Sequence, residues 1–134
     1  MSISGGNCVF LFLSILDQLW RYTKENRLEN KSGAWMFQDK TWSIPKDGDH
    51  AHAGFIKDQE SAMVLTLCEN DSSGDNEVIL KIVDRENPFG QKWRRSKANE
   101  DGWFTFVNPE NNEFLTLQSE EKLIVLGNNK SFIF

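Results

Sequence analysis

Gln91-Lys92-Trp93 is a Gln-x-Trp motif, and the same motif occurs earlier in the chain as Gln18-Leu19-Trp20. The second occurrence is followed by Trp103-Phe104-Thr105-Phe106, a polar turn, and Phe114-Leu115-Thr116-Leu117. An earlier segment has the same layout, with Gly54-Phe55-Ile56, a polar turn, and Val64-Leu65-Thr66-Leu67. Internal similarity of this kind indicates that one structural unit has been copied. It favours binding positions repeated around a pseudo-symmetric body over a single catalytic cleft.

Short apolar segments and turn formers alternate along the rest of the chain. The segments are rich in β-branched and aromatic residues, and the stretches between them are rich in Asn, Asp, Gly, Ser and Pro. This pattern predicts an all-β sandwich or barrel. The expected strands cover residues 35–37, 42–44, 63–67, 78–83, 103–107, 114–117 and 123–126. Over residues 12–24 the apolar spacing fits a helix face about as well as a strand, so a helix is the alternative there.

Length and charge restrict the class of protein. The 134 residues predict one domain over 1–134, with ten Phe and five Trp supplying core area. Fifteen basic and twenty acidic residues give a net charge of -5, which argues against nucleic acid as the partner. The one local basic cluster, formed by Lys92, Arg94, Arg95 and Lys97, is more simply interpreted as a solvated strand end.

The N-terminal region holds the strongest apolar run, over residues 9–16. It has no preceding basic region and is too short to span a bilayer, so a buried strand without membrane insertion is expected, with a cytoplasmic location. Cys8 and Cys68 are interpreted as small buried hydrophobes rather than a disulfide framework. Sequons at Asn30, Asn70 and Asn129 matter only in a secreted chain.

Together these segments resemble the ricin B-type lectin family, whose repeats close with Gln-x-Trp. The middle of the chain, from Gly54 to Trp93, follows the family order of strand, turn, strand, strand and Gln-x-Trp. Residues 94–134 give a second copy in which Phe132 would replace the closing Trp, and residues 28–42 give a shortened first copy. The resemblance implies a β-trefoil with three pseudo-repeats, the first irregular. Residues 8–20 would then supply the strands that the first copy lacks.

The resemblance also implies where a sugar would bind, and there this chain departs from the family. The Asp that accepts hydrogen bonds from sugar hydroxyls is replaced by Thr66 in the middle copy and by Thr116 in the last. The stacking aromatic falls at or near Ile82. A neutral Thr still accepts one hydrogen bond, but a charged acceptor binds more strongly. The scaffold is therefore expected to persist while the usual galactose-type pocket is largely lost.

The tryptophans divide into two groups. Trp20, Trp93 and the neighbouring Gln91 are expected in the core, because the family's closing Trp fills the barrel and its Gln ties backbone groups together. Trp35, Trp42 and Trp103 are less determined, and an exposed Trp among them would serve as an interface anchor.

Two polar segments, residues 47–52 and 70–77, contain residue types that can bind metal ions. Asp47-Gly48-Asp49-His50-Ala51-His52 combines carboxylates and imidazoles that suit a divalent metal, but no further ligand set is visible and a polar loop is favoured. The segment from Asn70 to Glu77 lacks the EF-hand spacing, so a solvated hairpin tip is favoured. No motif for nucleophilic catalysis or phosphate binding occurs. No metal, cofactor or catalytic residue is therefore predicted.

The sequence as a whole predicts a non-catalytic binding module, with a protein partner favoured over a glycan. A glycan site should place a carboxylate beside an exposed aromatic, and the candidates are Asp101 with Trp103 and Asp39 with Trp42, with Thr66 as a neutral acceptor. A protein-binding module should instead expose an apolar patch. An enzyme would require a deep polar cleft around His50 and His52. The sequence leaves the oligomeric state open.

Overall fold

The computed structural model describes residues 15–46, 53–69, 76–86, 88, 90–110, 112–119 and 122–126, and this part of the chain is built from strands. The expected all-β class is confirmed. A single 3-10 turn, η1 (Ile15–Gln18), precedes the first strand. The strands are β1 (Trp20–Tyr22), β2 (Leu28–Asn30), β3 (Trp42–Ser43), β4 (Lys57–Asp58), β5 (Val64–Glu69), β6 (Asn76–Lys81), β7 (Arg94–Arg95), β8 (Phe106–Asn108), β9 (Glu113–Ser119) and β10 (Lys122–Leu126).

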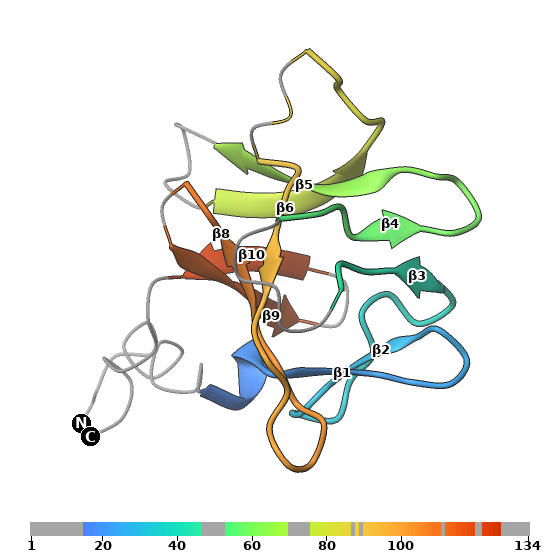
Figure 1. Cartoon of the computed structure of the whole chain (residues 1–134), viewed down its shortest axis with the longest axis vertical. Helices are drawn as coiled ribbons and strands as arrows, with labels where there is room; N and C mark the ends of the chain where they lie inside the picture. Colours follow the sequence, from blue (N-terminus) through green and yellow to red (C-terminus); the bar gives the residue numbers. More distant parts are fainter. Residues whose placement is uncertain are drawn as a thin grey trace, which may run out of the picture.

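The strands form one large antiparallel sheet and one small ribbon. The large sheet has the strand order β3-β4-β5-β6-β10-β9-β8-β7 and curls into a half-barrel, whereas β1 and β2 pair only with each other. In Figure 1 the β5–β6 pair lies at the top and the β1–β2 ribbon at the bottom. The pairing of β6 with β10, in which Val78 lies opposite Leu123, joins the middle of the chain to its last described segment.

The same polar turn precedes β5 and β9. The side chain of Asp58 accepts a hydrogen bond from the Glu60 amide (3.2 Å), and that of Asn108 accepts one from the Glu110 amide (2.8 Å). In both turns the residue four positions later, Ala62 or Asn112, has a positive φ, 64° and 58° respectively. Asn and Asp favour such turns because their short side chains bond the backbone two residues on. Copies of the unit noticed in the sequence therefore adopt the same local conformation 50 residues apart.

Three tryptophans meet in the core through one repeated contact. Trp20, Trp42 and Trp93 are fully buried, and each indole Nε1 donates to a backbone carbonyl on a neighbouring segment. The pairs are Trp20 with Leu115 (3.2 Å), Trp42 with Met36 (3.2 Å) and Trp93 with Leu65 (3.1 Å). Their backbone amides also donate in a matching way, to the carbonyls of Phe104, Asn26 and Gly54 respectively. Each buried ring thus has its polar atom satisfied, as a buried indole requires.

The contact of Trp42 closes a much shorter segment of chain than the contact of Trp93. Leu65 and Trp93 are separated by the whole β5–β6 region, whereas Met36 and Trp42 are separated only by residues 37–41. The chain reverses there at Phe37, whose φ is 52°. The expected strand over residues 35–37 is therefore wrong, and only an isolated bridge at Trp35 remains.

The N-terminal expectations are also corrected where residues are described. Residues 15–18 form η1 rather than a buried strand, and the side chain of Leu16 is 41% exposed. The alternative of a helix over 12–24 is wrong from Trp20 onward, because β1 is extended. Cys68 is half-buried rather than buried, whereas Asn30, a sequon residue, is completely buried. Cys8, Asn70, Asn129 and Phe132 lie outside the described residues.

Candidate interaction surface

Gln91 and its neighbours hold the chain around the repeated motif. Its side-chain Nε2 donates to the Thr66 hydroxyl (3.3 Å) and to the Ile82 carbonyl (2.9 Å), while its Oε1 accepts from the Asp84 amide (2.9 Å). Gln18 donates in the same manner to the Thr116 hydroxyl (3.2 Å). Trp20, Trp93 and Gln91 occupy the core positions expected for them. The Gln91 side chain therefore holds two backbone groups, at Ile82 and Asp84, and the Thr66 hydroxyl, and so shapes the surface beside it.

Thr66 does not offer the hydroxyl that a sugar would need. Its side chain is only 7% exposed, and its Oγ1 donates to the Val64 carbonyl (3.0 Å) while accepting from Gln91. Thr116 is completely buried and donates to the Phe114 carbonyl (2.8 Å). Because both hydroxyls are already used inside the protein, the assignment of Thr66 as a ligand-binding residue is corrected to a structural one.

Trp42 is likewise a core residue, so the pairing of Asp39 with Trp42 as a stacking site is wrong. Asp39 is exposed and lines an open depression of about 380 Å³. The aromatic residue that lines this depression is Phe37, a half-buried side chain, rather than Trp42. The remaining lining residues are polar: Gln38, Lys40, Thr41, Asp58 and Glu60.

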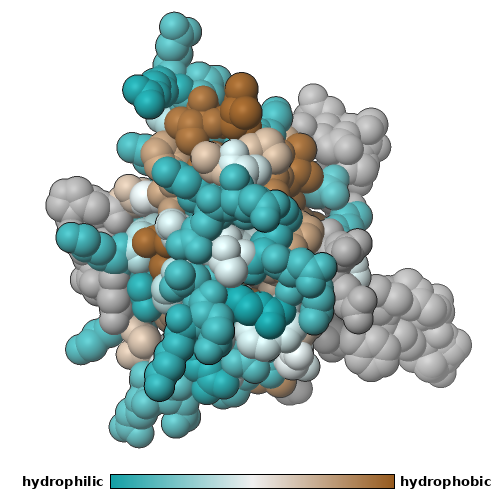
Figure 2. Space-filling view, turned by 90° about the vertical axis from the view of Figure 1, so that its right-hand side faces the viewer, coloured by the Kyte–Doolittle hydropathy of each residue, from teal (hydrophilic) through white to brown (hydrophobic). Residues whose placement is uncertain are grey.

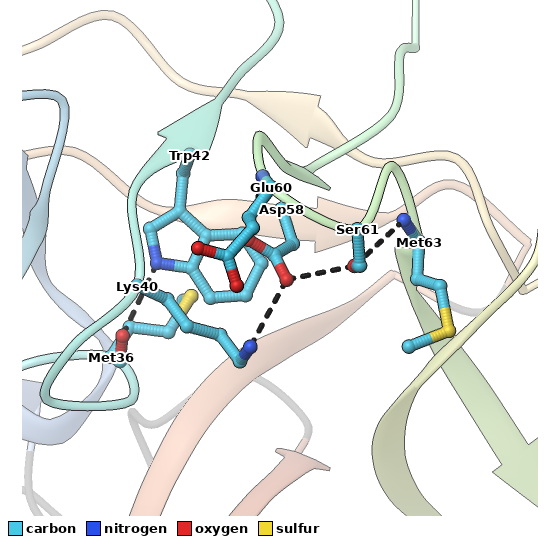
Figure 3. Close-up of polar contacts among 7 residues, drawn as sticks. All are labelled: Met36, Lys40, Trp42, Asp58, Glu60, Ser61 and Met63. Carbon is cyan, nitrogen blue, oxygen red and sulfur yellow. Dashed lines mark hydrogen bonds and ion pairs between the residues drawn. The ribbon is translucent and has the colours of Figure 1, made fainter.

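Asp58 is a buried carboxylate among the lining residues of this depression, and Figure 3 shows its polar contacts. It accepts hydrogen bonds from Lys40 Nζ (3.0 Å), Ser61 Oγ (2.8 Å) and the Glu60 amide (3.2 Å). Burial raises the pKa of Asp58, but the hydrogen bonds from Ser61, Lys40 and the Glu60 amide, together with the Lys40 charge, outweigh burial and hold that pKa below its ordinary value. The Lys40 side chain lies two residues before the buried Trp42 and pairs with the Asp58 carboxylate, which ties the Lys40 segment to the turn before β5.

Trp103, the other stacking candidate, is half-buried and carries cations against its ring. The Arg21 guanidinium lies 4.3 Å from the ring centroid and the Lys31 ammonium lies 5.6 Å from it. Asp101 is exposed and lies two residues before Trp103, but the cation on the Trp103 ring, Arg21, pairs with Glu29 (2.8 Å). Trp35 is covered in the same way by Arg27, at 3.9 Å. The structure thus uses both rings to hold arginines of the β1–β2 ribbon.

A second depression is an apolar groove with basic lining residues, one of which, Lys92, directly follows Gln91. We call it the Phe55 groove; it has a volume of about 350 Å³. Its lining residues are Phe55, Lys57, Val83, Asp84, Arg85, Pro88 and Lys92. A smaller depression of about 180 Å³ shares Pro88 and Lys92 with it and continues to Ala53, Gly90, Pro109 and Glu110. We call the two neighbouring depressions together the trough.

Two exposed apolar side chains precede the groove residue Val83 in the sequence. Ile82, directly before Val83, is 76% exposed, and Ile79 on β6 is 38% exposed. Figure 2 shows hydrophobic residues gathered toward the top of the molecule, above a largely hydrophilic middle. The β5–β6 pair and the chain that follows β6 lie at that end (Figure 1). A single exposed isoleucine needs no explanation, but Ile82 directly precedes a residue of an apolar groove and Ile79 lies three positions before Ile82, which is the kind of surface that marks a contact site.

The Phe55 groove is not predicted by the sequence, although one of its cations, Lys92, belongs to the basic cluster seen there. Lys92 was grouped with Arg94, Arg95 and Lys97 as a strand end. In the structure the Arg95 guanidinium lies over Phe104 (4.1 Å) and donates to the Pro45 carbonyl (3.2 Å), so it is taken into the fold. Lys92 alone turns to the groove. Its cationic neighbours there, Lys57 and Arg85, come from distant parts of the chain, which only the tertiary structure brings together.

The described residues contain neither a group of metal ligands nor a membrane-spanning helix. Within the described ranges, no three His, Cys, Asp or Glu side chains are placed to hold a metal ion. The motif at residues 47–52 lies outside those ranges, as does most of the loop from Asn70 to Glu77. None of the described helical segments combines the length and the apolar character that a bilayer crossing demands.

Comparison with known proteins adds no relative. No protein-family model, no curated protein and no solved structure matches this chain.

Proposed function

We propose that this chain is a non-catalytic protein-binding module, built on a β-trefoil scaffold of the ricin B type, and that it binds through the Phe55 groove and the adjacent isoleucines. The proposal joins an inference about the scaffold to an inference about the surface.

The scaffold inference rests on the three-fold repetition of one contact. Trp20, Trp42 and Trp93 each donate to a carbonyl of a neighbouring segment and pair through the backbone amide in matching ways. Two of these copies add a Gln-to-Thr hydrogen bond. In this interpretation the first Gln-x-Trp closes the last copy, since Trp20 contacts Leu115 as Trp93 contacts Leu65. The short copy, from Met36 to Trp42, lacks a hairpin.

The observation that carries the function is the exposure of Ile82 beside an apolar groove. Its side chain is 76% exposed, directly after the last residue of β6 in the large sheet. Exposing an isoleucine costs solvation free energy that a partner would recover, at roughly 25 cal/mol for each Å² buried. The groove next to it supplies the concave part that such a contact needs, with Phe55, Val83 and Pro88 as its apolar surface. Anchors of this kind dominate binding energy at protein interfaces.

The positions at which the ricin B-type family binds sugars also favour a protein partner over a glycan, because in this chain they are already engaged within the fold. The hydroxyls of Thr66 and Thr116 are engaged inside the fold, and the half-buried rings of Trp35 and Trp103 are covered by arginines. A sugar would have to displace those arginines to stack.

A glycan is the second candidate function, at the depression beside Asp39. That surface combines the half-buried ring of Phe37 with the exposed carboxylates of Asp39 and Glu60. Carboxylates accept hydrogen bonds from sugar hydroxyls, and an adjacent aromatic packs against the apolar face of a sugar. The two candidates therefore occupy different surfaces and can be tested separately.

A photo-crosslinking experiment tests the proposal. A benzoylphenylalanine is placed at position 82 in one protein and at position 25, an exposed site in the β1–β2 turn, in a control protein. Both are irradiated in extract of the source cells, with Ile79→Asp introduced into a second copy of each. We expect a discrete protease-sensitive adduct from position 82 that Ile79→Asp reduces, and none from position 25.

The purified chain is also screened on a glycan array, together with the variants Asp39→Asn and Glu60→Gln, which alter the carboxylates of the second candidate site. Equal adducts from both positions, or no adduct from position 82, would contradict the proposal. Glycan binding abolished by Asp39→Asn, with position 82 silent, would establish the second candidate instead.

A further inference from the structure

We infer that the partner segment that enters the Phe55 groove is short, acidic and equipped with an apolar side chain. This inference rests on the proposed protein-binding function and specifies its chemistry.

The charge of the groove is opposite to that of the whole protein. Lys57, Arg85 and Lys92 line it against a single carboxylate, that of Asp84, although the chain carries a net charge of -5. None of the three cations forms an ion pair with a carboxylate in the described part of the chain, where the ion pairs are Arg21 with Glu29 and Lys40 with Asp58. Their charges are therefore available to a ligand, and a positive patch on an acidic protein selects an acidic partner.

The carboxylates near the groove have other tasks. The Asp84 side chain accepts a hydrogen bond from the Glu86 amide (3.1 Å) and so closes the turn after β6. At the far end of the trough, the Glu110 side chain accepts one from the Gly90 amide (3.2 Å). Both carboxylates are tied to backbone N–H groups, so each has part of its acceptor capacity committed to shaping the trough.

The floor and the dimensions define the rest of the ligand. The Lys92 ammonium lies 5.6 Å from the centroid of the Phe55 ring, which places a charge directly beside an apolar surface. A volume of about 350 Å³ lies at the small end of the range of about 300–1,000 Å³ for ligand pockets, so a side chain or two fits and a folded domain does not. A carboxylate adjacent to a Leu or Phe would satisfy the rim and the floor together.

Fluorescence polarisation on the full chain tests this inference with three sets of labelled heptapeptides. All carry a central Leu or Phe, and the flanking residues are Glu and Asp, Gln and Asn, or Lys. We expect saturable binding of the acidic set only, weakened about tenfold between 50 and 300 mM NaCl because exposed charges are screened. Lys92→Glu and Arg85→Glu should each raise the Kd about fivefold or more. The charge-matched control Lys97→Glu, an exposed lysine outside the groove, should leave it unchanged.

Several results would overturn the inference. These are equal binding of the neutral set, an equal effect of Lys97→Glu, equal binding of an acidic heptapeptide with a central Ser in place of Leu or Phe, or tighter binding of heparin oligosaccharide or single-stranded DNA than of any peptide. A crosslinked protein at position 82 together with no acidic-peptide binding would leave the protein-binding function standing and refute the acidic segment. Silence at position 82 would refute the function itself. The folded state of each variant is checked by circular dichroism, and Lys92→Gln provides a milder second variant.

Discussion

At the scale of single residues, the interior of this protein is organised by buried polar atoms that each have a defined partner. The three indole nitrogens bond carbonyls, and the amide of Gln91 bonds three backbone or side-chain groups. Asn108 is an exception, because its Nδ2 is buried without a hydrogen-bond partner among the described residues. A buried polar group is costly when its partner is removed, so single substitutions at these sites should have large and readable effects.

Trp93→Phe tests the repeated contact. Phenylalanine keeps an aromatic ring in the core but leaves the Leu65 carbonyl without its donor and leaves a small cavity. We expect a loss of about 2–3 kcal/mol in the free energy of unfolding, measured by urea denaturation. Trp103→Phe is the control, because its half-buried ring keeps its place beside Arg21, and it should cost less than about 1 kcal/mol. Equal losses would show that the indole hydrogen bond has no special weight.

Asp58 should make stability depend on acid. Its folded pKa is lowered, so the carboxylate contributes stability that is fully present above the unfolded pKa of about 3.9 and is lost as pH falls through the folded value. We expect the gap in unfolding free energy between the wild type and Asp58→Asn to be widest near pH 6 and to narrow as pH is lowered toward 2.5. Urea midpoints over that range measure it. A gap that stays constant with pH would mean that the charge of Asp58 is not stabilising.

At the scale of elements, close approach of backbones decides what the segments beside β5 tolerate. Gly90 has φ 79°, and a Cβ added there would lie 2.8 Å from the Leu67 carbonyl oxygen, which belongs to β5. The same two residues are joined by a hydrogen bond from the Leu67 amide to the Gly90 carbonyl (2.8 Å). The glycine before Gln91 therefore lets the chain return tightly against β5, and that return forms part of the trough wall.

Gly90→Ala should accordingly be strongly destabilising. It combines an unfavourable positive φ with a clash against backbone, and we expect a loss of about 2–4 kcal/mol by thermal or urea unfolding. Gly33→Ala is the matched control, since Gly33 also has a positive φ (109°) but no atom lies within 4 Å of the added Cβ. That variant should lose only about 1 kcal/mol. If both cost the same, the contact with Leu67 would be irrelevant.

At the scale of the whole molecule, the beginning and the end of the described chain depend on each other. Gln18 and Trp20 bond Thr116 and Leu115, and the backbone of Trp20 pairs with that of Phe104 through reciprocal hydrogen bonds of 2.8 Å. Such contacts span nearly a hundred residues of sequence. The last copy of the proposed trefoil is complete only when the first Gln-x-Trp closes it.

Removing residues 1–22 should therefore abolish cooperative folding rather than trim the structure. Trp20 leaves a large hole in the core, and the Leu115 carbonyl loses its donor. We expect a chain that starts at Thr23 to lose near-ultraviolet circular dichroism and to unfold without a sharp transition. Leu16→Ser in the full chain is the control, because this side chain is 41% exposed, and it should unfold cooperatively. A well-dispersed NMR spectrum from the shortened chain would contradict this account.

The candidate surface shows where sequence reasoning reaches its limit. Burial of Trp20, Gln91 and Trp93 followed from a motif whose members are close in sequence. The prediction that Asp39 and Trp42 form a stacking site is wrong because Trp42 is completely buried in the core. Trp42 follows a tight turn at Phe37 that the sequence did not indicate. The Phe55 groove was not predicted, because Lys57, Arg85 and Lys92 are far apart in sequence and carry no shared motif.

The sequence by itself determined the all-β class, the matching turns before β5 and β9, and the core role of the Gln-x-Trp residues. These features depend on alternation, turn chemistry and local spacing, which are properties of neighbouring residues. Only the tertiary structure decided that Gln18 and Trp20 contact β9, that Trp42 is buried, and that three cations line an apolar groove. Each of these depends on the registration of strands from distant parts of the chain, and the packing free energy of the complete core sets that registration.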